Sequence, residues 1–390
     1  MSNAHTPTVE AVTSSAVSPA GAACLEARFS KRRVDDEREF LLDVAFDAAP
    51  GFTILFGASG AGKTTLLDCV AGLTTPDAGR ISIGSRVLFD SSPKTDLAVA
   101  LRRVGYVFQD LAIFPHMTVE QNVGYGLAHL RNAERAARLS AILDAFRIAP
   151  LARRNAREIS GGERQRTALA RTLVTDPEIL LLDEPLAALD AATKAQIIED
   201  LRAWNRAHRI PILYVTHSRE EVFALGERVI VLDAGRIVAR GTPHEVMMAP
   251  MQQTVAQLVG FENIFDAIVE AVRPERGTMN CRIAGDGGSL VLETPLVRGG
   301  VGAALRVGIR AGDILLATSA PVGLSARNVI PGRIQSLEQR DVIVSALVRC
   351  RVEMEVHLTL AARDSLQLAP GKEVWLVIKT HSCHLMQPSG

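Results

Sequence analysis

Two patterns of apolar positions divide the chain. Up to about residue 260, short and almost wholly apolar runs alternate with longer segments of mixed polarity; the clearest runs are residues 52–56, 179–182 and 212–215. Runs of this kind are typical of parallel strands that are covered on both faces. From about residue 265, short β-like runs alternate instead with Gly, Pro and Asp turns. This second pattern favours a small all-β barrel.

The two patterns predict specific elements. In the first part we expect helices at 63–73, 118–158 throughout, 191–208, 243–248 and 251–259, and a helix that residues 159–166 open and that runs to 173. Strands are expected there as two runs within 25–46 and at 52–56, 79–83, 86–89, 103–109, 179–182 and 212–215, with a hairpin at 229–240 and a loop at 90–96. In the second part we expect strands at 301–309, 314–317, 342–348, 352–360 and 374–379. The fold class is therefore an α/β domain followed by a small all-β, OB-like barrel domain.

Domain boundaries follow from the same reading. Residues 1–23 are rich in Ala, Ser, Thr and Val with few charges, and we expect a disordered tail rather than a signal peptide, because a basic start and a sustained apolar segment are both missing. The α/β domain spans 24–260 and includes a helical subdomain at about 110–165. The all-β domain spans 261–390, with its core at about 322–388.

Bulk composition excludes several classes. Lys plus Arg and Asp plus Glu both total 43, so an overall basic field for nucleic acid is absent. The five cysteines are scattered without a C-x-x-C pair, which suits free thiols in a reducing compartment. No run approaches 18 uninterrupted apolar residues, and any membrane role is therefore expected to come through a partner.

The clearest chemical motif is the stretch at 57–64, which reads G-x-x-x-x-G-K-T between an apolar run and a helical segment. Glycines let successive N–H groups converge on phosphate oxygens, and the helix start adds its dipole. Lys63 is predicted to reach the β- and γ-phosphates and the Thr64 hydroxyl to bind Mg²⁺. The predicted nucleotide-binding residues here are Gly57, Ala58, Ser59, Gly60, Ala61, Gly62, Lys63, Thr64 and Thr65.

Polar residues also follow three of the other predicted strands, where ligands bind in open α/β sheets. Asp183 is predicted to hold Mg²⁺, and Glu184 to act as general base on the attacking water. Gln109 is a candidate sensor of that water or of the metal, and His217 a candidate contact to the γ-phosphate. For Gln109 and His217, an ordinary structural role at a strand end is the competing interpretation.

A second anion-binding motif opens a helix at residues 159–166, which read I-S-G-G-E-R-Q-R. A serine and two glycines at a helix start offer backbone donors to an anion. Two phosphate-binding motifs far apart in one domain indicate that two copies of the chain cooperate.

Taken in order, these motifs resemble those of an ABC transporter ATPase. The resemblance implies that the α/β domain is a P-loop NTPase. It rests on the phosphate-binding loop (P-loop) at 57–64, Gln109, I-S-G-G-E at 159–163, L-L-L-D-E-P at 180–185, A-L-D at 188–190 and T-H at 216–217. Glu163 departs from the Gln that is usual in the family, and we expect it to preserve the helix start. The family also has an adenine-stacking aromatic residue that has no clear counterpart in this chain.

The resemblance implies a homodimer with two ATP molecules between the copies. Ser160, Gly161, Gly162 and Asp190 would belong to the nucleotide site, and Ser160 and Gly162 of one copy would contact the γ-phosphate held by the other. Closure on ATP with Mg²⁺, and reopening after hydrolysis, would drive a separate permease. The segment at 110–123 is where the family docks on that permease, and Phe114, Pro115 and Met117 are candidate contacts.

The last part of the chain resembles small molybdate-binding barrels of the Mop/TOBE type. Residues 325–328 read S-A-R-N, and 375–380 resemble the closing strand of such domains. The resemblance makes Ser325, Arg327, Lys379 and Thr380 candidate oxyanion-binding residues, and a dianion suits hydroxyl donors with one or two cations. Two uses of the barrel stay open: binding molybdate, or a structural and dimerising role.

The order of domains is similar to that of molybdate importer ATPases. This implies an ATP hydrolase, peripheral on the cytoplasmic face of the inner membrane, whose permease receives molybdate or tungstate from an extracytoplasmic binding protein. Alternatives are an importer ATPase for sulfate, iron, polyamine or sugar, a soluble ABC ATPase acting in DNA repair or translation, and a molybdate-responsive regulator or storage protein. The S-A-R-N stretch argues against the first, neutral charge against the second, and the full set of catalytic positions against the third.

Overall fold

The computed structural model describes residues 24–35, 38–247, 250, 253–285, 287–297, 299–340 and 342–386. The disordered tail expected at 1–23 lies outside these residues. The chain forms two compact units, Met1–Thr53 with Thr64–Tyr214, and Ile54–Lys63 with Val215–Gly390. Strand β3 (Gly51–Phe56) and helix α1 (Lys63–Ala71) connect them along the chain.

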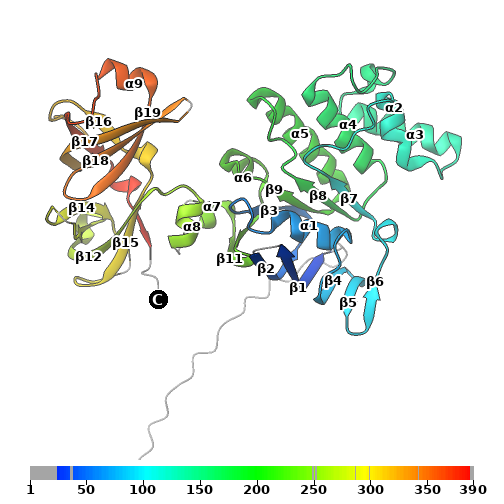
Figure 1. Ribbon diagram of the computed structural model, residues 1–390, viewed down its shortest axis with the longest axis horizontal. Coiled ribbons are helices and arrows are strands. Elements are labelled where there is room, and N and C mark those ends of the chain that lie inside the picture. The colour runs from blue at the N-terminus through cyan, green and yellow to red at the C-terminus, as the bar shows by residue number, and fades with distance from the viewer. Residues whose placement is uncertain are drawn as a thin grey trace, which may run out of the picture. The chain divides into compact units, whose positions relative to one another are not determined.

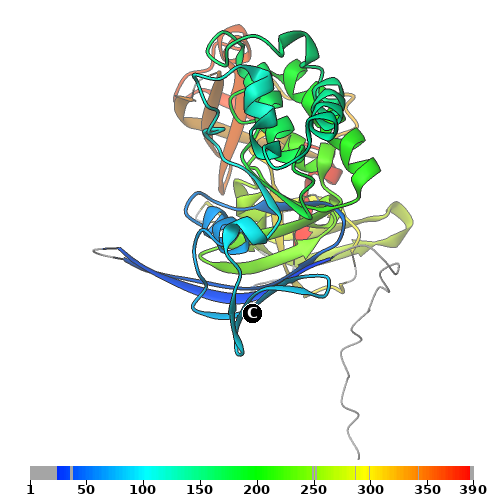
Figure 2. The same cartoon turned by 90° about the vertical axis from the view of Figure 1, so that its right-hand side faces the viewer.

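The first unit begins with an antiparallel set of strands. β1 (Leu25–Asp35) pairs with β2 (Arg38–Ala48) along its whole length and with β4 (Ala78–Ile83) only as far as Ser30. The outer half of the β1–β2 hairpin is therefore a two-stranded arm, drawn in blue at the lower left of Figure 2. β5 (Arg86–Ser91) pairs with β4 and with β6 (Lys94–Asp96). The loop expected at 90–96 is wrong, because Ser91 pairs with Lys94 across a tight turn.

The parallel strands of this unit carry the site. β7 (Val104–Val107) runs parallel to β8 (Ile179–Asp183), which neighbours β9 (Pro211–Val215), and helix α5 (Ala191–His208) connects β8 to β9. Every residue of β8 and β9 is buried, as the apolar runs predicted for strands covered on both faces. β7 is shorter than the strand predicted at 103–109.

The helical subdomain of the first unit is interrupted rather than helical throughout. It contains α2 (Val119–Val123), α3 (Asn132–Ala145) and α4 (Gly161–Leu173), with short 3₁₀ turns at Gly124–Leu127 and Ala149–Leu151. The continuous helix predicted at 118–158 is wrong: glycines 124 and 126 lie in the first turn, and Pro150, which has no N–H to donate, lies in the second. The three helices pack together (Figure 1) around Leu139, Ile142 and Phe146.

The second unit contains an α/β part. β10 (Arg228–Asp233) and β11 (Arg236–Gly241) form the hairpin that the sequence predicted, and β10 neighbours β3. Helices α6 (Arg219–Leu225), α7 (Pro243–Met247) and α8 (Gln253–Leu258) complete this part.

The described residues from Asn263 to Met386 form β-strands with short 3₁₀ turns and one α-helix, α9 (Leu360–Ser365), which confirms the predicted fold class. It has two five-stranded antiparallel sheets that share one hydrophobic core. The first has the order β14 (Leu290–Pro295), β13 (Thr278–Ile283), β12 (Asn263–Arg273), β15 (Ala304–Ile309), β21 (His384–Met386). The second has the order β16 (Leu315–Ala317), β20 (Glu373–Ile378), β17 (Asn328–Arg340), β18 (Ile343–Arg349), β19 (Glu353–Thr359). Sequence reasoning missed β12, β13, β14, β17 and β21. Outward positions of β12 and β13 carry Asp266, Glu270 and Arg282, which break up the apolar runs there.

Among the described residues, no helix has the length and apolar character that a membrane span requires.

Candidate nucleotide and anion sites

The glycine-rich loop between β3 and α1 has the geometry that its motif requires. Gly62 has a φ of +101°, which an L side chain rarely adopts. A Cβ added at Gly57 would lie 2.1 Å from the carbonyl oxygen of Leu232 on β10. Lys63, almost fully buried, donates from Nζ to the carbonyl oxygens of Gly57 (2.9 Å) and Ala58 (2.8 Å). The loop therefore curls around a buried cation, where a phosphate would gain charge-assisted hydrogen bonds.

Thr64 follows Lys63 in the chain and contacts the end of β8. Its hydroxyl donates to the Asp183 carboxylate, with 2.9 Å between Oγ1 and Oδ2, and Asp183 is buried. A hydroxyl and a carboxylate oxygen brought together in this way are hard ligands of the kind that Mg²⁺ prefers. The residues present thus fit the metal that the sequence predicted here.

Glu184 stands in a left-handed conformation directly after Asp183. Its φ is +45°, which is uncommon for a residue other than glycine and costs conformational energy. Such strain persists where the surroundings hold it, and it clusters at functional sites. The turn it makes begins immediately after the last residue of β8, at the carboxyl edge of the sheet.

Gln109 reaches the same edge from the neighbouring strand. Val107 of β7 is in register with Leu182 of β8, so Gln109 and the pair Asp183–Glu184 both follow the carboxyl ends of adjacent parallel strands. Gln109 is exposed.

Two half-buried polar residues support this edge and were missed by sequence reasoning. Tyr106 of β7 donates its hydroxyl to Asp68 of α1 (3.3 Å), one helical turn beyond Thr64. Burial is the main reason that the pKa of Asp68 is raised. The pKa of Tyr106 is also raised, first by burial and then by the charges of Asp68 and Asp183. Only their positions, four residues after Thr64 and three before Gln109, could have drawn attention to them.

Ser160 and Glu163 close the start of α4 as a reciprocal capping box. The Ser160 hydroxyl accepts from the Glu163 N–H (3.3 Å), and the Glu163 carboxylate accepts from the Ser160 N–H (2.7 Å). The second bond is the main reason that the pKa of Glu163 is lowered. Glu163 thus preserves the helix start, as expected, and the Ser160 hydroxyl still has its own hydrogen to donate.

Asp190 caps the start of α5, accepting from the Thr193 N–H at 3.0 Å; this bond is the main reason that its pKa is lowered. The two helix starts lie close together, because a Cβ added at Gly162 would lie 2.6 Å from the Thr193 side chain.

His217 is exposed two residues after β9. The turn that carries it is fixed by buried Thr216, which donates to Glu221 (2.8 Å) and accepts from the Ser218 N–H (3.0 Å). The sequence did not single out the Thr216–Glu221 pair.

The four oxyanion candidates occupy different surroundings. Ser325 is exposed in a loop. Arg327 and Lys379 are exposed at one end of the sheet, where Asn328 of β17 pairs with Ile378 of β20. Thr380 is buried, and its hydroxyl donates to the Glu293 carboxylate at 3.3 Å. The structure therefore brings Arg327 and Lys379 to one surface and turns the Thr380 hydroxyl toward a carboxylate.

Asn328, the last residue of S-A-R-N, has a structural contact. Its side-chain amide exchanges two hydrogen bonds with the backbone of Glu293, at 2.7 and 2.9 Å. This pairing ties β17 of one sheet to β14 of the other.

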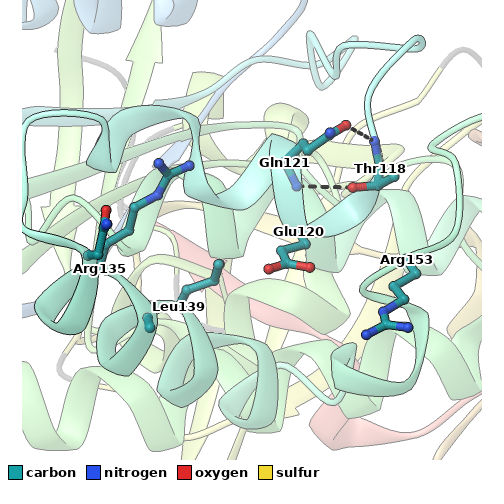
Figure 3. Close-up of a pocket in the computed structure, with 8 residues that line it drawn as sticks. Thr118, Glu120, Gln121, Arg135, Leu139 and Arg153 are labelled. Atoms are coloured by element: carbon teal, nitrogen blue, oxygen red, sulfur yellow. Dashed lines mark hydrogen bonds between the residues drawn. The ribbon is translucent and has the colours of Figure 1, made fainter.

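A cavity of about 480 Å³ lies within the helical subdomain (Figure 3), next to the segment expected to dock on a permease. In Figure 3 the Glu120 side chain lies between those of Arg135 and Arg153, and the capping bonds between Thr118 and Gln121 form one rim. Phe114 of the same segment is half-buried, 4.7 Å from the ring of Tyr125, whereas Pro115 is exposed.

Comparisons with known proteins match both parts of the chain. Residues 41–187 match the ABC transporter family model and residues 324–385 the TOBE domain model. The chain is 39% identical over 346 residues to the molybdenum import ATP-binding protein ModC of Paramagnetospirillum magneticum, covering 87% of this chain and 93% of that protein. It is 36% identical over 355 residues to the molybdate/tungstate import ATP-binding protein WtpC of Pyrococcus horikoshii, covering 90% and 97%. A dimeric bacterial ABC transporter cassette superposes on 56% of this chain and 98% of its own, with 27% identity and a TM-score of 0.50.

Proposed function

Because this chain belongs to the molybdenum import ATP-binding proteins of the ABC transporter family, we propose that it is the ATP-hydrolysing subunit that powers molybdate uptake through a separate permease. The observation that carries the proposal is that the similarity spans both the ATPase region and the all-β region, not the ATPase motifs alone.

In this proposal the glycine-rich loop holds the phosphates of ATP. The backbone N–H groups between Gly57 and Thr65 supply donors, and Lys63 supplies the charge. Thr64 and Asp183, whose side chains are in contact, would hold Mg²⁺ together with Gln109. The ion would neutralise charge on the phosphates when bound.

The roles in hydrolysis follow from position. Glu184 would take the proton of the attacking water as general base, with Gln109 orienting that water from the neighbouring strand. His217 would donate to the γ-phosphate. The strained backbone at Glu184 supports its assignment, since strain of this kind is retained where it serves a site.

We further propose a homodimer in which each nucleotide contacts both copies. Ser160, Gly161 and Gly162 present a helix start with a serine hydroxyl, and the Asp190 helix start lies beside it. These groups would meet the γ-phosphate held by the other copy. The similar cassette of known structure is dimeric.

The remaining partners complete an importer. A permease would dock on the segment at 110–123 and the adjoining cavity, which would place the chain peripherally on the cytoplasmic face of the inner membrane. An extracytoplasmic binding protein would deliver the substrate. Tungstate is a second candidate substrate, favoured by the molybdate/tungstate relative. In the all-β region, Arg327 and Lys379 are the best placed of the four oxyanion candidates, because they share one exposed sheet end.

The test is to delete the gene in its own host and measure molybdenum, tungsten, sulfur, iron and polyamine uptake. The proposal expects molybdenum uptake to fall and to be restored by the wild-type gene but not by the Glu184→Gln variant. A defect confined to sulfate, iron or polyamine would favour another importer. Intact uptake of all of them, with nucleic acid recovered on the purified chain, would favour a soluble ABC ATPase.

A further inference from the structure

The segment between β7 and α2 contains two successive residues in a left-handed conformation. Leu111 has a φ of +61° and Ala112 of +45°. Neither is a glycine, and for other residues this region is disfavoured by contact between Cβ and the backbone. Interactions from elsewhere must therefore hold the turn in place.

Arg171 of α4 supplies those interactions. Its Nη1 donates to the carbonyl oxygen of Ala112 at 2.7 Å and its Nη2 to that of Leu111 at 2.9 Å. The planar fork of a guanidinium fits two successive carbonyl oxygens, a geometry that a lysine ammonium cannot reproduce. Burial lowers the pKa of Arg171, which indicates that these bonds replace water around the charge.

The same guanidinium also lies over the ring of Phe114, 5.3 Å from its centroid. Beyond that ring, buried Asn122 of α2 fixes the other end of the segment: its side chain accepts from the Phe114 N–H (2.9 Å) and donates to the Phe114 (3.0 Å) and Thr118 (3.1 Å) carbonyls. Helix α4 thus holds the left-handed turn, and α2 and α4 together hold Phe114. These two helices pack on each other (Figure 1).

The position of this turn connects two parts of the proposed site. Gln109 lies two residues before Leu111, at the sheet edge that carries Asp183. Ser160 lies at the other end of α4, about 16 Å from Arg171 along the helix axis at 1.5 Å per residue. A single rigid helix therefore reaches from the Ser160 start to the turn that follows Gln109.

We propose that Arg171 is a positioning residue for hydrolysis: its two hydrogen bonds to the Leu111–Ala112 turn fix Gln109 relative to α4, so that the helix and Gln109 move as one body. The inference rests on the proposed function, because it gives Gln109 and α4 their roles in ATP hydrolysis. Arg171 itself is remote from the reacting atoms in this account and acts only through the backbone it binds.

The test uses the purified full-length chain with the variants Arg171→Lys, Ala112→Gly and their combination. Arg171→Lys is expected to lower kcat for ATP about tenfold and to leave KM within twofold, because the phosphate loop is untouched. Chymotrypsin should also cut sooner within 108–117. Adding Ala112→Gly should recover much of kcat, because glycine adopts the left-handed conformation without the clamp. Ala112→Gly alone should behave as wild type.

Arg103→Lys is the matched control. Arg103 also donates to the carbonyl of a left-handed residue, Asp176 (3.3 Å), but at the opposite ends of β7 and β8. The Arg103→Lys variant should have the same kcat as the wild type. The proposal is overturned if Arg171→Lys keeps the wild-type kcat. It is also overturned if adding Ala112→Gly recovers none of the kcat lost in Arg171→Lys, because Arg171 would then have a general structural role. An inactive wild-type chain would instead refute the proposed function, and cleavage within 108–117 would still report on the clamp.

Discussion

The chain carries two candidate anion sites that are built in different ways. The glycine-rich loop is a run of consecutive residues whose donors are backbone N–H groups, closed by Lys63 against its own carbonyls. The candidates in the all-β region are side chains from two segments, and of these Arg327 and Lys379 share a surface while Thr380 binds Glu293. A site made of backbone is complete wherever its motif folds. A site made of side chains depends on the direction in which each strand presents them.

The largest expected effect separates binding from turnover in the backbone-built site. Glu184→Gln should retain ATP binding, because the loop donors and Lys63 remain, while kcat falls by about 10²-fold or more through loss of the general base. Steady-state ATPase assays and nucleotide titration by calorimetry measure the two quantities. Wild-type turnover in this variant would remove Glu184 from the role of base.

The second effect tests the one side chain on which the backbone-built site depends. Lys63→Ala should weaken nucleotide binding about 10- to 100-fold, because a charge-assisted hydrogen bond to phosphate disappears. Lys94→Ala, at an exposed position on β6, is the control and should bind normally. Equal affinity in the two variants would mean that backbone donors alone hold the phosphates.

The third effect tests whether side chains of the all-β region form an anion site. If the all-β region binds molybdate, Lys379→Ala should weaken binding up to about tenfold, whereas Thr380→Val should leave binding unchanged and lower the free energy of unfolding by about 1 kcal/mol, because Glu293 loses a donor. Calorimetry with molybdate, tungstate and sulfate, and thermal unfolding, measure these changes. If Thr380→Val instead weakens molybdate binding and Lys379→Ala does not, Thr380 belongs to the anion site. The Glu293 carboxylate would then have to move away when the anion binds. Absence of binding in the wild-type chain would favour the structural and dimerising use.

The same contrast explains what the sequence could predict. The loop at 57–64 and the candidates Gln109, Asp183 and His217 could be predicted from the sequence, because each belongs to a local motif that follows a predicted strand. The Thr380–Glu293 hydrogen bond joins residues 87 positions apart. The sequence around Thr380 does not indicate that a carboxylate lies nearby. Likewise, Leu111 and Ala112 do not look like turn residues; Arg171, 60 positions on, holds them in a conformation that their own propensities disfavour.

The smallest effect tests a second backbone-built feature, the start of α4. The pKa of Glu163 is lower in the folded chain, because its carboxylate accepts from the Ser160 N–H. A lowered folded pKa means that this contribution to stability is fully present above the ordinary Glu pKa and is lost as pH falls through the folded value. Glu163→Gln keeps the capping box without the titration. The wild type should therefore be more stable than the variant near neutral pH, by less than about 1 kcal/mol as expected for a cap, and the difference should vanish in acid. Unfolding by denaturant at neutral and acidic pH measures the difference, with Glu353→Gln, at an exposed position of β19, as the control. A stability difference that persists in acid would mean that the amide introduced by Glu163→Gln disturbs the helix start. The Glu163 carboxylate would then not be the group whose titration changes the stability.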